Sequence, residues 1–317
     1  MTTSGTYSFS VSRDDIIRQA MLNIGKLGEG ETPTASDTAD CARILNMVVK
    51  QWQGTADFAP GLKTWTRRRG YLFLSGTSGQ YQLGPAAIGW TKSFKKTTLT
   101  SVALSGSSTL VLDSSTGLTI GDHIGVDIGG DLFWTTILTV TPSITVAAPL
   151  TADAQAGAVV YSYTTVSTQP VVIEAVVLRD TDNSDTPLRF LEQQDYDLLP
   201  SKTDNLSAAD PAAVYHEFQL GTSYLYTDTW GSVDMTKYLV ITYMEAIQDF
   251  NNPLDTPEYP QEWFLALCWG LAEQIAPMYH VEFTQLMTRL AASSLAIAQK
   301  KEPQKQTMYF QPGEDGL

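Results

Sequence analysis

The sequence contains little cysteine, little histidine and few basic residues. Its 317 residues include 2 cysteines, 3 histidines and 20 Lys or Arg, against 34 Asp or Glu. Cys41 and Cys268 are far apart, in apolar surroundings, and match no C-x-x-C spacing, which argues against a disulfide framework or a zinc site. The histidines do not have the spacing of a metal motif such as H-E-x-x-H. We therefore expect neither a metal nor a cofactor.

The net charge of -14 argues against a protein that grips nucleic acid, because such proteins bind phosphates through Lys and Arg that displace counterions. An acidic protein suits a surface along which DNA must move without adhering. The one basic concentration contains Arg67, Arg68 and Arg69, with lysines before and after them. It is interpreted either as a charged strand edge or as a contact with the tail, a neighbouring copy or another acidic partner.

Long apolar runs are also missing. The longest, FLALCWGLA at 264–272, is too short to span a bilayer. The first residues, MTTSGTYSFSVSR, show no basic stretch followed by an apolar one, so no secretion signal is expected. The sequence thus predicts a protein that acts without a membrane.

Residues 25–37, GKLGEGETPTASD, have the glycines and lysine of a phosphate loop but not their order. A P-loop follows a buried strand and reads G-x-x-x-x-G-K-[ST], whereas this lysine precedes most of the glycines and the segment before it has helical spacing. We interpret the stretch as a connection between two helices, with Gly28 in the left-handed region at the end of the first. No G-x-S-x-G elbow occurs either, and we expect the chain not to be an enzyme.

Helices are expected at both ends of the chain. Ser12 and Thr34 each stand three residues before an aspartate, a capping-box-like pattern that begins a helix. In the last helix the pattern places five apolar residues on one side: Phe283, Leu286, Leu290, Leu295 and Ala298. Apolar residues recur at helical intervals in four stretches: about 12–27, 34–52, 260–280 and 281–301.

The middle of the chain is expected to form strands. Alternating apolar residues around SGTSG at 75–79 indicate a hairpin. From about 92 to 168 the chain is rich in Thr, Ser, Val and Gly, with short apolar runs between turns, which is typical of a small all-β module. We expect this module to be an insertion that can be deleted without unfolding the rest.

The predicted fold class is therefore α+β: a helical bundle built from the N- and C-terminal helix pairs, with a β-strand middle region and an inserted small all-β module. Residues 1–91 and 169–301 form the main domain in this interpretation. Residues 92–168 form the inserted module, and residues 302–317 form an extended C-terminal arm.

Three stretches of the sequence, taken in order, resemble a known family. They are DDIIRQAMLNIGKLGEGETPTASDTADCARILNMVVKQWQ at 14–53, RFLEQQDYDLLP at 189–200 and IQDFNNPLDTPEYPQEWFLALCWGLAEQIAPMYH at 247–280. The same features recur in the same order in the head-to-tail adaptors of short-tailed bacteriophages. These features are a Gly-rich turn after a helix, E-T-P, a second helix ending near Trp, a late D-x-P, and a helix carrying L-A-x-x-x-A-P-x-Y. That family is often called packaged-DNA stabilisation or tail accessory proteins.

The resemblance implies a structural protein of the virion neck and tail, assembled in the host cytoplasm. It implies a homo-oligomeric ring, commonly of twelve copies, that docks beneath the portal protein and holds the tail tube or nozzle protein below. Genomic DNA would pass through the ring without sequence-specific binding. Residues 1–91 and 169–301 would then be the adaptor domain.

The C-terminal arm is expected to dock on the portal or on a neighbouring copy. Pro303 and Pro312 prevent a continuous helix, and three apolar side chains stand together in a stretch that has no other apolar pattern. The predicted contact residues are Lys300, Lys301, Met308, Tyr309 and Phe310.

Two other functions are kept as alternatives. Trp134, Tyr161 and Tyr163 could form an aromatic platform for sugars, which would suit a virion adhesin or carbohydrate-binding module. The same residues could instead pack a small β core. A hydrolase of the cell envelope is the third possibility.

Overall fold

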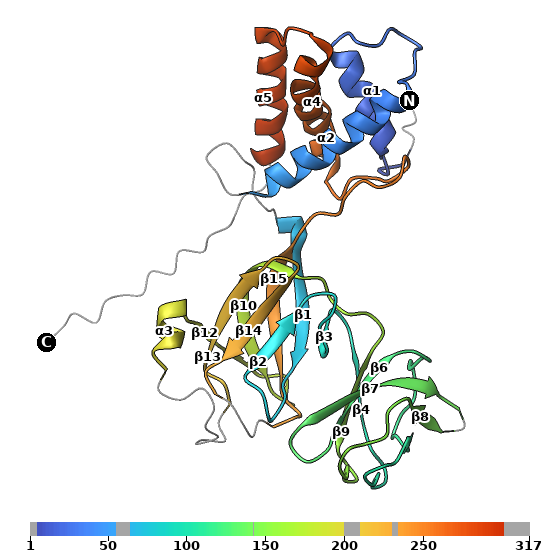
Figure 1. Ribbon diagram of the computed structural model, residues 1–317, viewed down its shortest axis with the longest axis vertical. Coiled ribbons are helices and arrows are strands. Elements are labelled where there is room, and N and C mark those ends of the chain that lie inside the picture. Colours follow the sequence, from blue (N-terminus) through green and yellow to red (C-terminus); the bar gives the residue numbers. More distant parts are fainter. Residues whose placement is uncertain (1–4, 55–63, 142, 200–209, 230–233, 301–317) are drawn as a thin grey trace, which may run out of the picture. The chain divides into compact units, whose positions relative to one another are not determined.

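The computed structural model describes residues 5–54, 64–141, 143–199, 210–229 and 234–300 (Figure 1). The chain divides into two compact units. One, here called the helical unit, comprises Met1–Trp65 and Ile247–Leu317, so both ends of the chain contribute to it. The other, here called the β unit, comprises Thr66–Ala246.

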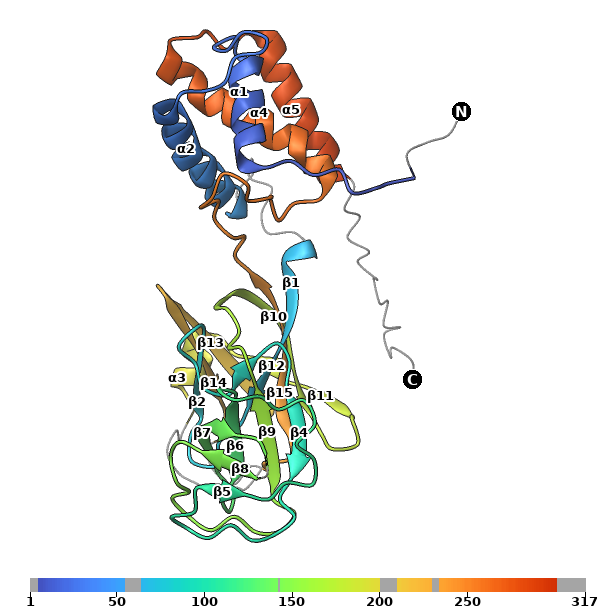
Figure 2. The same cartoon turned by 90° about the vertical axis from the view of Figure 1, so that its right-hand side faces the viewer.

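The helical unit is built around one central helix. Helix α4 (Phe264–Ile275) packs against α1 (Arg13–Asn23), α2 (Ala35–Gln53) and α5 (Gln285–Lys300) (Figures 1 and 2). Two short 3-10 helices, η2 (Gln261–Trp263) and η3 (Ala276–Tyr279), adjoin the ends of α4. The apolar faces of these elements meet in a single core that includes Ile16, Ile17, Met21, Leu45, Leu267 and Leu271.

The helix starts follow the sequence closely. The Ser12 side chain accepts a hydrogen bond from the Asp15 backbone N–H, and the Asp15 carboxylate accepts one from the Ser12 N–H, which completes a capping box. Thr34 caps α2 by accepting a hydrogen bond from the Asp37 N–H. Both predicted helix starts are thus confirmed.

Three sheets form the described part of the β unit, one of them curved into a half-barrel (Figure 1). The five-stranded sheet has the order β11 (Asp185–Pro187), β10 (Pro170–Arg179), β15 (Tyr238–Glu245), β1 (Arg67–Phe73) and β3 (Trp90–Thr91). The four-stranded sheet has the order β12 (Arg189–Phe190), β13 (Ala213–Gln219), β14 (Thr222–Thr227) and β2 (Gln80–Leu83). Helix α3 (Gln193–Asp197) follows β12 in the chain. The six-stranded sheet has the order β4 (Lys95–Thr98), β9 (Val159–Tyr163), β6 (His123–Asp127), β7 (Leu132–Thr139), β8 (Ile144–Val146) and β5 (Thr109–Leu110).

The predicted fold class is wrong, because the molecule is mostly β. Strands account for 31% of the structure and helices for 26%, so the helices do not form the main body. The sequence pattern overstated them for a physical reason. A helix of eleven or more residues shows its apolar spacing clearly, whereas β3, β5 and β12 are two residues long and show no alternation.

The six-stranded sheet lies within the predicted insertion of 92–168 but shares a core with its neighbours. It has an apolar cluster of its own around Ile124 and Val160. Tyr161 and Tyr163 belong instead to the larger core that also contains Phe73 of β1. The domain boundaries drawn from the sequence stay a prediction, and the arm of 302–317 lies outside the described residues.

Strand glycines let indole rings pack directly on the backbone. A Cβ added to Gly70 of β1 would lie 2.2 Å from the Trp90 ring, and one on Gly125 of β6 would lie 2.8 Å from the Trp134 ring. No side chain other than hydrogen fits at these places. Trp90 is thereby fully buried inside the β unit.

Candidate functional site

The two main stretches of the family resemblance meet in the helical unit. The Tyr279 hydroxyl of η3 donates a hydrogen bond of 2.8 Å to the Asp37 carboxylate of α2. The Cys41 sulfur lies 3.7 Å from the same hydroxyl, and the Lys26 ammonium lies 4.9 Å from the centre of the Tyr279 ring. This cluster, here called the Tyr279 junction, ties α2 and the loop before it to the segment after α4.

The charges of the Tyr279 junction favour a structural role. Hydrogen bonds from Thr34 and Tyr279 lower the pKa of Asp37, so its carboxylate stays ionised and accepts both. Burial raises the pKa of the Cys41 thiol, which keeps it protonated, and a thiol is a poor nucleophile compared with a thiolate. Burial and the hydrogen bond to Asp37 also raise the pKa of Tyr279.

The loop 24–34 is a connection between helices, but its geometry differs from the prediction in one detail. Helix α1 ends at Asn23, and Gly25, with φ 72°, is the residue in the left-handed region there, instead of Gly28. The Gly28 N–H donates to the Glu31 carboxylate at 2.7 Å. A carboxylate of the chain itself therefore uses an N–H group that a phosphate would need.

Two of the three arginines of the cluster are paired within the β unit. Arg67 forms a salt bridge with Glu174, and Arg68 and Lys92 both contact the Glu245 carboxylate at 2.6 Å. Arg69 is exposed, and its charge helps to lower the pKa of Asp185. The role of Arg67, Arg68 and Arg69 in contacts with the tail or a neighbouring copy stays a prediction.

Glu245 is the most enclosed carboxylate of this network, with a side chain 10% exposed. Burial by itself would raise its pKa. Hydrogen bonds from Lys92 and Thr168, together with the positive charges of Lys92 and Arg68, outweigh burial and hold the pKa below its ordinary value. Glu245 is thus an ionised anchor that links β15 to β1 and to the residues beside β3.

The predicted contact residues of the arm are not part of the described structure. Lys301, Met308, Tyr309 and Phe310 lie outside the described residues, and Lys300 is the last residue of α5, with its side chain undescribed. Their role in docking stays a prediction.

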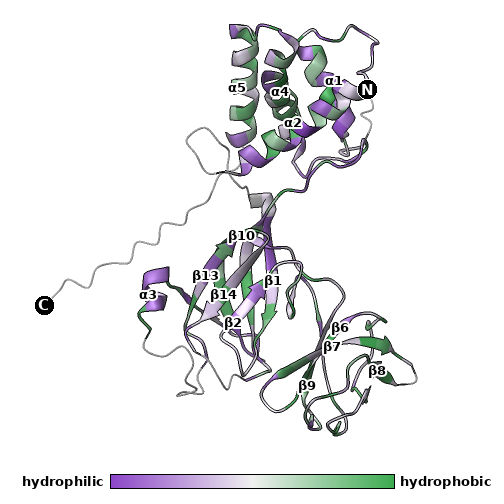
Figure 3. Ribbon diagram, viewed as in Figure 1, coloured by the Kyte–Doolittle hydropathy of each residue, from purple (hydrophilic) through white to green (hydrophobic). Residues whose placement is uncertain are grey.

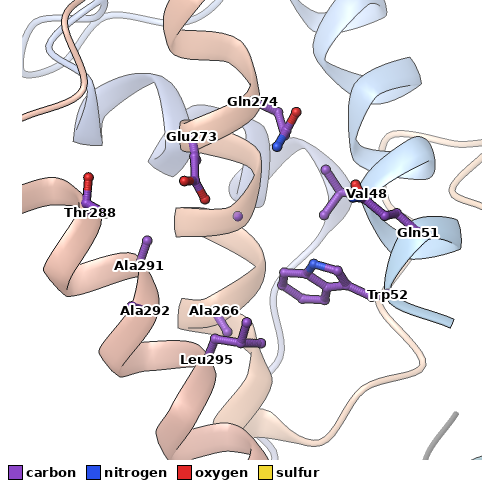
Figure 4. A pocket seen from close by; sticks show the side chains of 11 residues that line it. Val48, Gln51, Trp52, Ala266, Glu273, Gln274, Thr288, Ala291, Ala292 and Leu295 are labelled. Atoms are coloured by element: carbon purple, nitrogen blue, oxygen red, sulfur yellow. The ribbon is translucent and has the colours of Figure 1, made fainter. Parts of the chain in front are cut away.

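A first groove, here called the Trp52 groove, lies between α2, α4 and α5 and has a volume of about 280 Å³ (Figure 4). The Trp52 indole forms one wall and packs on Gly270, where a Cβ would lie 2.6 Å from the ring. Glu273 points into the groove from α4, and Leu295 and Ala291 line it from α5.

A second groove, here called the Phe9 groove, lies between α1 and α4 and has a volume of about 340 Å³. Its lining is mostly apolar: Phe9, Val11, Ile16, Leu22, Phe264, Leu265 and Cys268, with Asp15, Arg18 and Gln19 also present. The segment that carries Phe9 is held in place by Gln261, whose side-chain amide donates to the backbone oxygens of Tyr7 and Phe9, each at 2.8 Å.

A scan against family models gave no match, and a search of curated proteins gave no significant one. The geometry of the two units therefore carries the functional argument.

Two of the three aromatic residues that suggested a sugar platform lie inside the molecule, and the third is half-buried. Tyr161 and Tyr163 are buried, and their hydroxyls bond to the carbonyl oxygen of Met235 and the N–H of Gly89. Trp134 packs against the same core. The alternative of an adhesin or carbohydrate-binding module thus loses the observation that motivated it, and no observation favours an envelope hydrolase.

Neither a metal site nor a membrane span occurs in the described ranges. They contain no group of three or more His, Cys, Asp or Glu side chains placed to hold a metal ion. No helix in them has the length and apolarity to cross a bilayer.

The sequence pattern missed both grooves and misjudged one helix. Leu286 and Leu290 were expected on the same side as Ala298, which is buried against α4. They are instead 66% and 41% exposed. Helical spacing alone shows that Leu286 and Leu290 lie on a different face of the helix from Ala291 and Ser294, which are buried. The sequence does not show which of these two faces packs on α4.

Proposed function

We propose that this protein is a head-to-tail adaptor of a short-tailed bacteriophage: a structural virion protein whose copies form a ring between the portal and the tail tube. The observation that supports this most is the common core of residues 14–53 and 247–280. These stretches carry the family resemblance, are separated in the chain by the whole β unit, and lie together in one compact helical unit.

In this proposal the helical unit is the part that assembles. It binds the portal and the neighbouring copies, and the β unit binds the tail tube or nozzle protein. The Phe9 groove of the helical unit is an open, mostly apolar surface of the kind that protein partners cover. The acidic net charge of -14 suits a ring through which genomic DNA passes without sequence-specific binding.

DNA-filled heads that lack this protein provide the test. Added protein is expected to bind these heads in many copies and to reduce the leakage of DNA from them. Heads that lack the portal protein are expected not to bind it. Failure to bind DNA-filled heads would contradict the proposal. Specific binding to host glycans or cell-wall hydrolysis would support the adhesin or the hydrolase instead.

A further inference from the structure

Helix α5 exposes an apolar ridge. Leu286, Leu290 and Ile297 are 66%, 41% and 66% exposed, and intervals of four and seven residues place them on one face of the helix. The face that packs on α4 is a different one, formed by Ala291, Ser294 and Ala298. We call the three exposed residues the α5 ridge.

The ridge carries almost no charge. From Gln285 to Gln299 the only charged residue of α5 is Arg289, in a chain with 34 acidic residues. Solvated surface helices normally carry charges on their open face, and the centres of protein interfaces are depleted of them. A second copy of the same acidic chain could approach this helix with little repulsion.

The Phe9 groove lies on the other flank of the same unit. α5 and α1 pack on opposite sides of α4 (Figures 1 and 2), and the groove is formed where α1 meets α4. Phe9 is 67% exposed and Leu265 is 57% exposed. A cavity of about 150 Å³ holds a benzene ring, so a groove of about 340 Å³ has room for more than one leucine side chain.

We infer that the α5 ridge of one copy inserts into the Phe9 groove of the next copy. A convex apolar surface on one flank and a concave apolar surface on the other make a head-to-tail contact, which generates a ring when the rotation between copies closes. This inference rests on the proposed ring and names its contact. The Trp52 groove does not receive the ridge, since α5 itself lines that groove and both lie on the same flank.

A second copy is the occupant that these observations favour. Ridge and groove belong to the same unit, are both mostly apolar, and are carried by helices that pack on opposite sides of α4, which is what repeated self-association needs. The groove is also preformed, because Gln261 fixes its Phe9 wall with two hydrogen bonds. Binding to a fixed surface loses less conformational entropy than binding to a mobile one.

Two single substitutions test the contact in the full chain. Leu290→Glu places a charge on the ridge, and Leu265→Glu places one in the groove. Each is expected to weaken self-association about 30-fold or more, as for a residue at the centre of an interface. Leu286→Glu is the second ridge variant, in case Leu290→Glu perturbs the fold. Leu254→Glu, at a leucine 83% exposed in the same unit, is the matched control and is expected to assemble like the wild type.

A mixture of the two variants gives the most specific result. The Leu290→Glu chain keeps an intact groove and the Leu265→Glu chain keeps an intact ridge, so the mixture is expected to form dimers and nothing larger. A mixture that stays monomeric, or variants that assemble like the wild type, would overturn the inference. So would loss of self-association in solution on truncation after Lys301, because the arm would then be the occupant of the groove.

The measurement also separates this inference from the proposed function. The native mass of the wild type and of the variants is recorded in solution. The number of copies bound per head is counted on DNA-filled heads, because a ring that forms only on the portal is detected there. Full rings from both variants would refute the contact and leave the adaptor function standing. A wild type that forms no ring in solution and none on heads would refute both.

Discussion

Gly76→Ala is expected to detach the turn between β1 and β2 from the loop that precedes β7. A Cβ on Gly76 would lie 1.7 Å from the backbone oxygen of Gly130, and backbone cannot rotate away as a side chain can. Two hydrogen bonds hold the turn there: Ser75 donates to the Asp131 carboxylate at 2.6 Å and Thr77 donates to it at 3.1 Å. Because the turn must move, both bonds are expected to be lost.

The magnitude follows from those bonds. Hydrogen bonds to a charged group contribute about 1.5 to 3 kcal/mol each when buried, and less here because the site is partly exposed. The expected loss is roughly 2 to 4 kcal/mol in the free energy of unfolding of the β unit. Thr77→Ala is the control: it causes no clash, and it removes the 3.1 Å bond to Asp131 and the 3.1 Å hydrogen bond with the Ser75 hydroxyl. Its free energy of unfolding should fall by about 1 kcal/mol.

Calorimetry on the full chain measures the effect, with a double-mutant cycle to assign it. If the turn has moved, Asp131→Ala should cost much less in the Gly76→Ala background than in the wild type. Equal costs in the two backgrounds, or a Gly76→Ala chain that melts like the wild type, would refute the reasoning.

Three other predictions follow from the same geometry. Glu245→Gln should lower the free energy of unfolding by about 1.5 to 3 kcal/mol near neutral pH. Because the folded pKa of Glu245 is lowered, this contribution is present above the unfolded pKa and disappears as pH falls through the folded pKa. The melting curves of wild type and variant should therefore converge in acid, and a constant gap between them would contradict the account. Tyr279→Phe should lower the melting temperature of the helical unit, since it leaves Asp37 without its 2.8 Å hydrogen bond; an unchanged melting temperature would show that the junction is not structural. Truncation after Lys301 should abolish attachment to DNA-filled heads without changing the melting temperature, and unchanged attachment would remove the arm from the docking model.

The core that the six-stranded sheet shares with β1 changes the result expected for one variant. Deletion of 92–168 with a short Gly/Ser bridge was expected to be tolerated. Tyr161 and Tyr163 fill the core shared with Phe73, so the deletion is now expected to unfold the β unit, and a soluble, cooperatively melting deletion variant would contradict this.

Local features of the fold were predictable from the sequence, because they depend on neighbouring residues. The caps at Ser12 and Thr34 are examples. The SGTSG stretch does contain a tight turn, closed by a bridge between Ser75 and Ser78. Its two strands, however, enter different sheets, β1 beside β15 and β2 beside β14.

Features that depend on distant pairing were not predictable. The pairing of Arg67–Phe73 with Tyr238–Glu245 joins segments far apart in the chain, and a short strand carries no information about its partner. The same limit applies to the candidate site. The spacing of Leu286 and Leu290 marks an apolar stripe, but only the packing of α5 on α4 shows that this stripe is left open.

The central claim is that copies of this chain form a ring on the portal, and the most direct measurement is the native mass of the full chain with and without purified portal rings. The account predicts a complex that contains one copy of this protein for each portal subunit, twelve on a twelve-subunit portal. A complex with one or two copies per portal ring, or no complex at all, would contradict it.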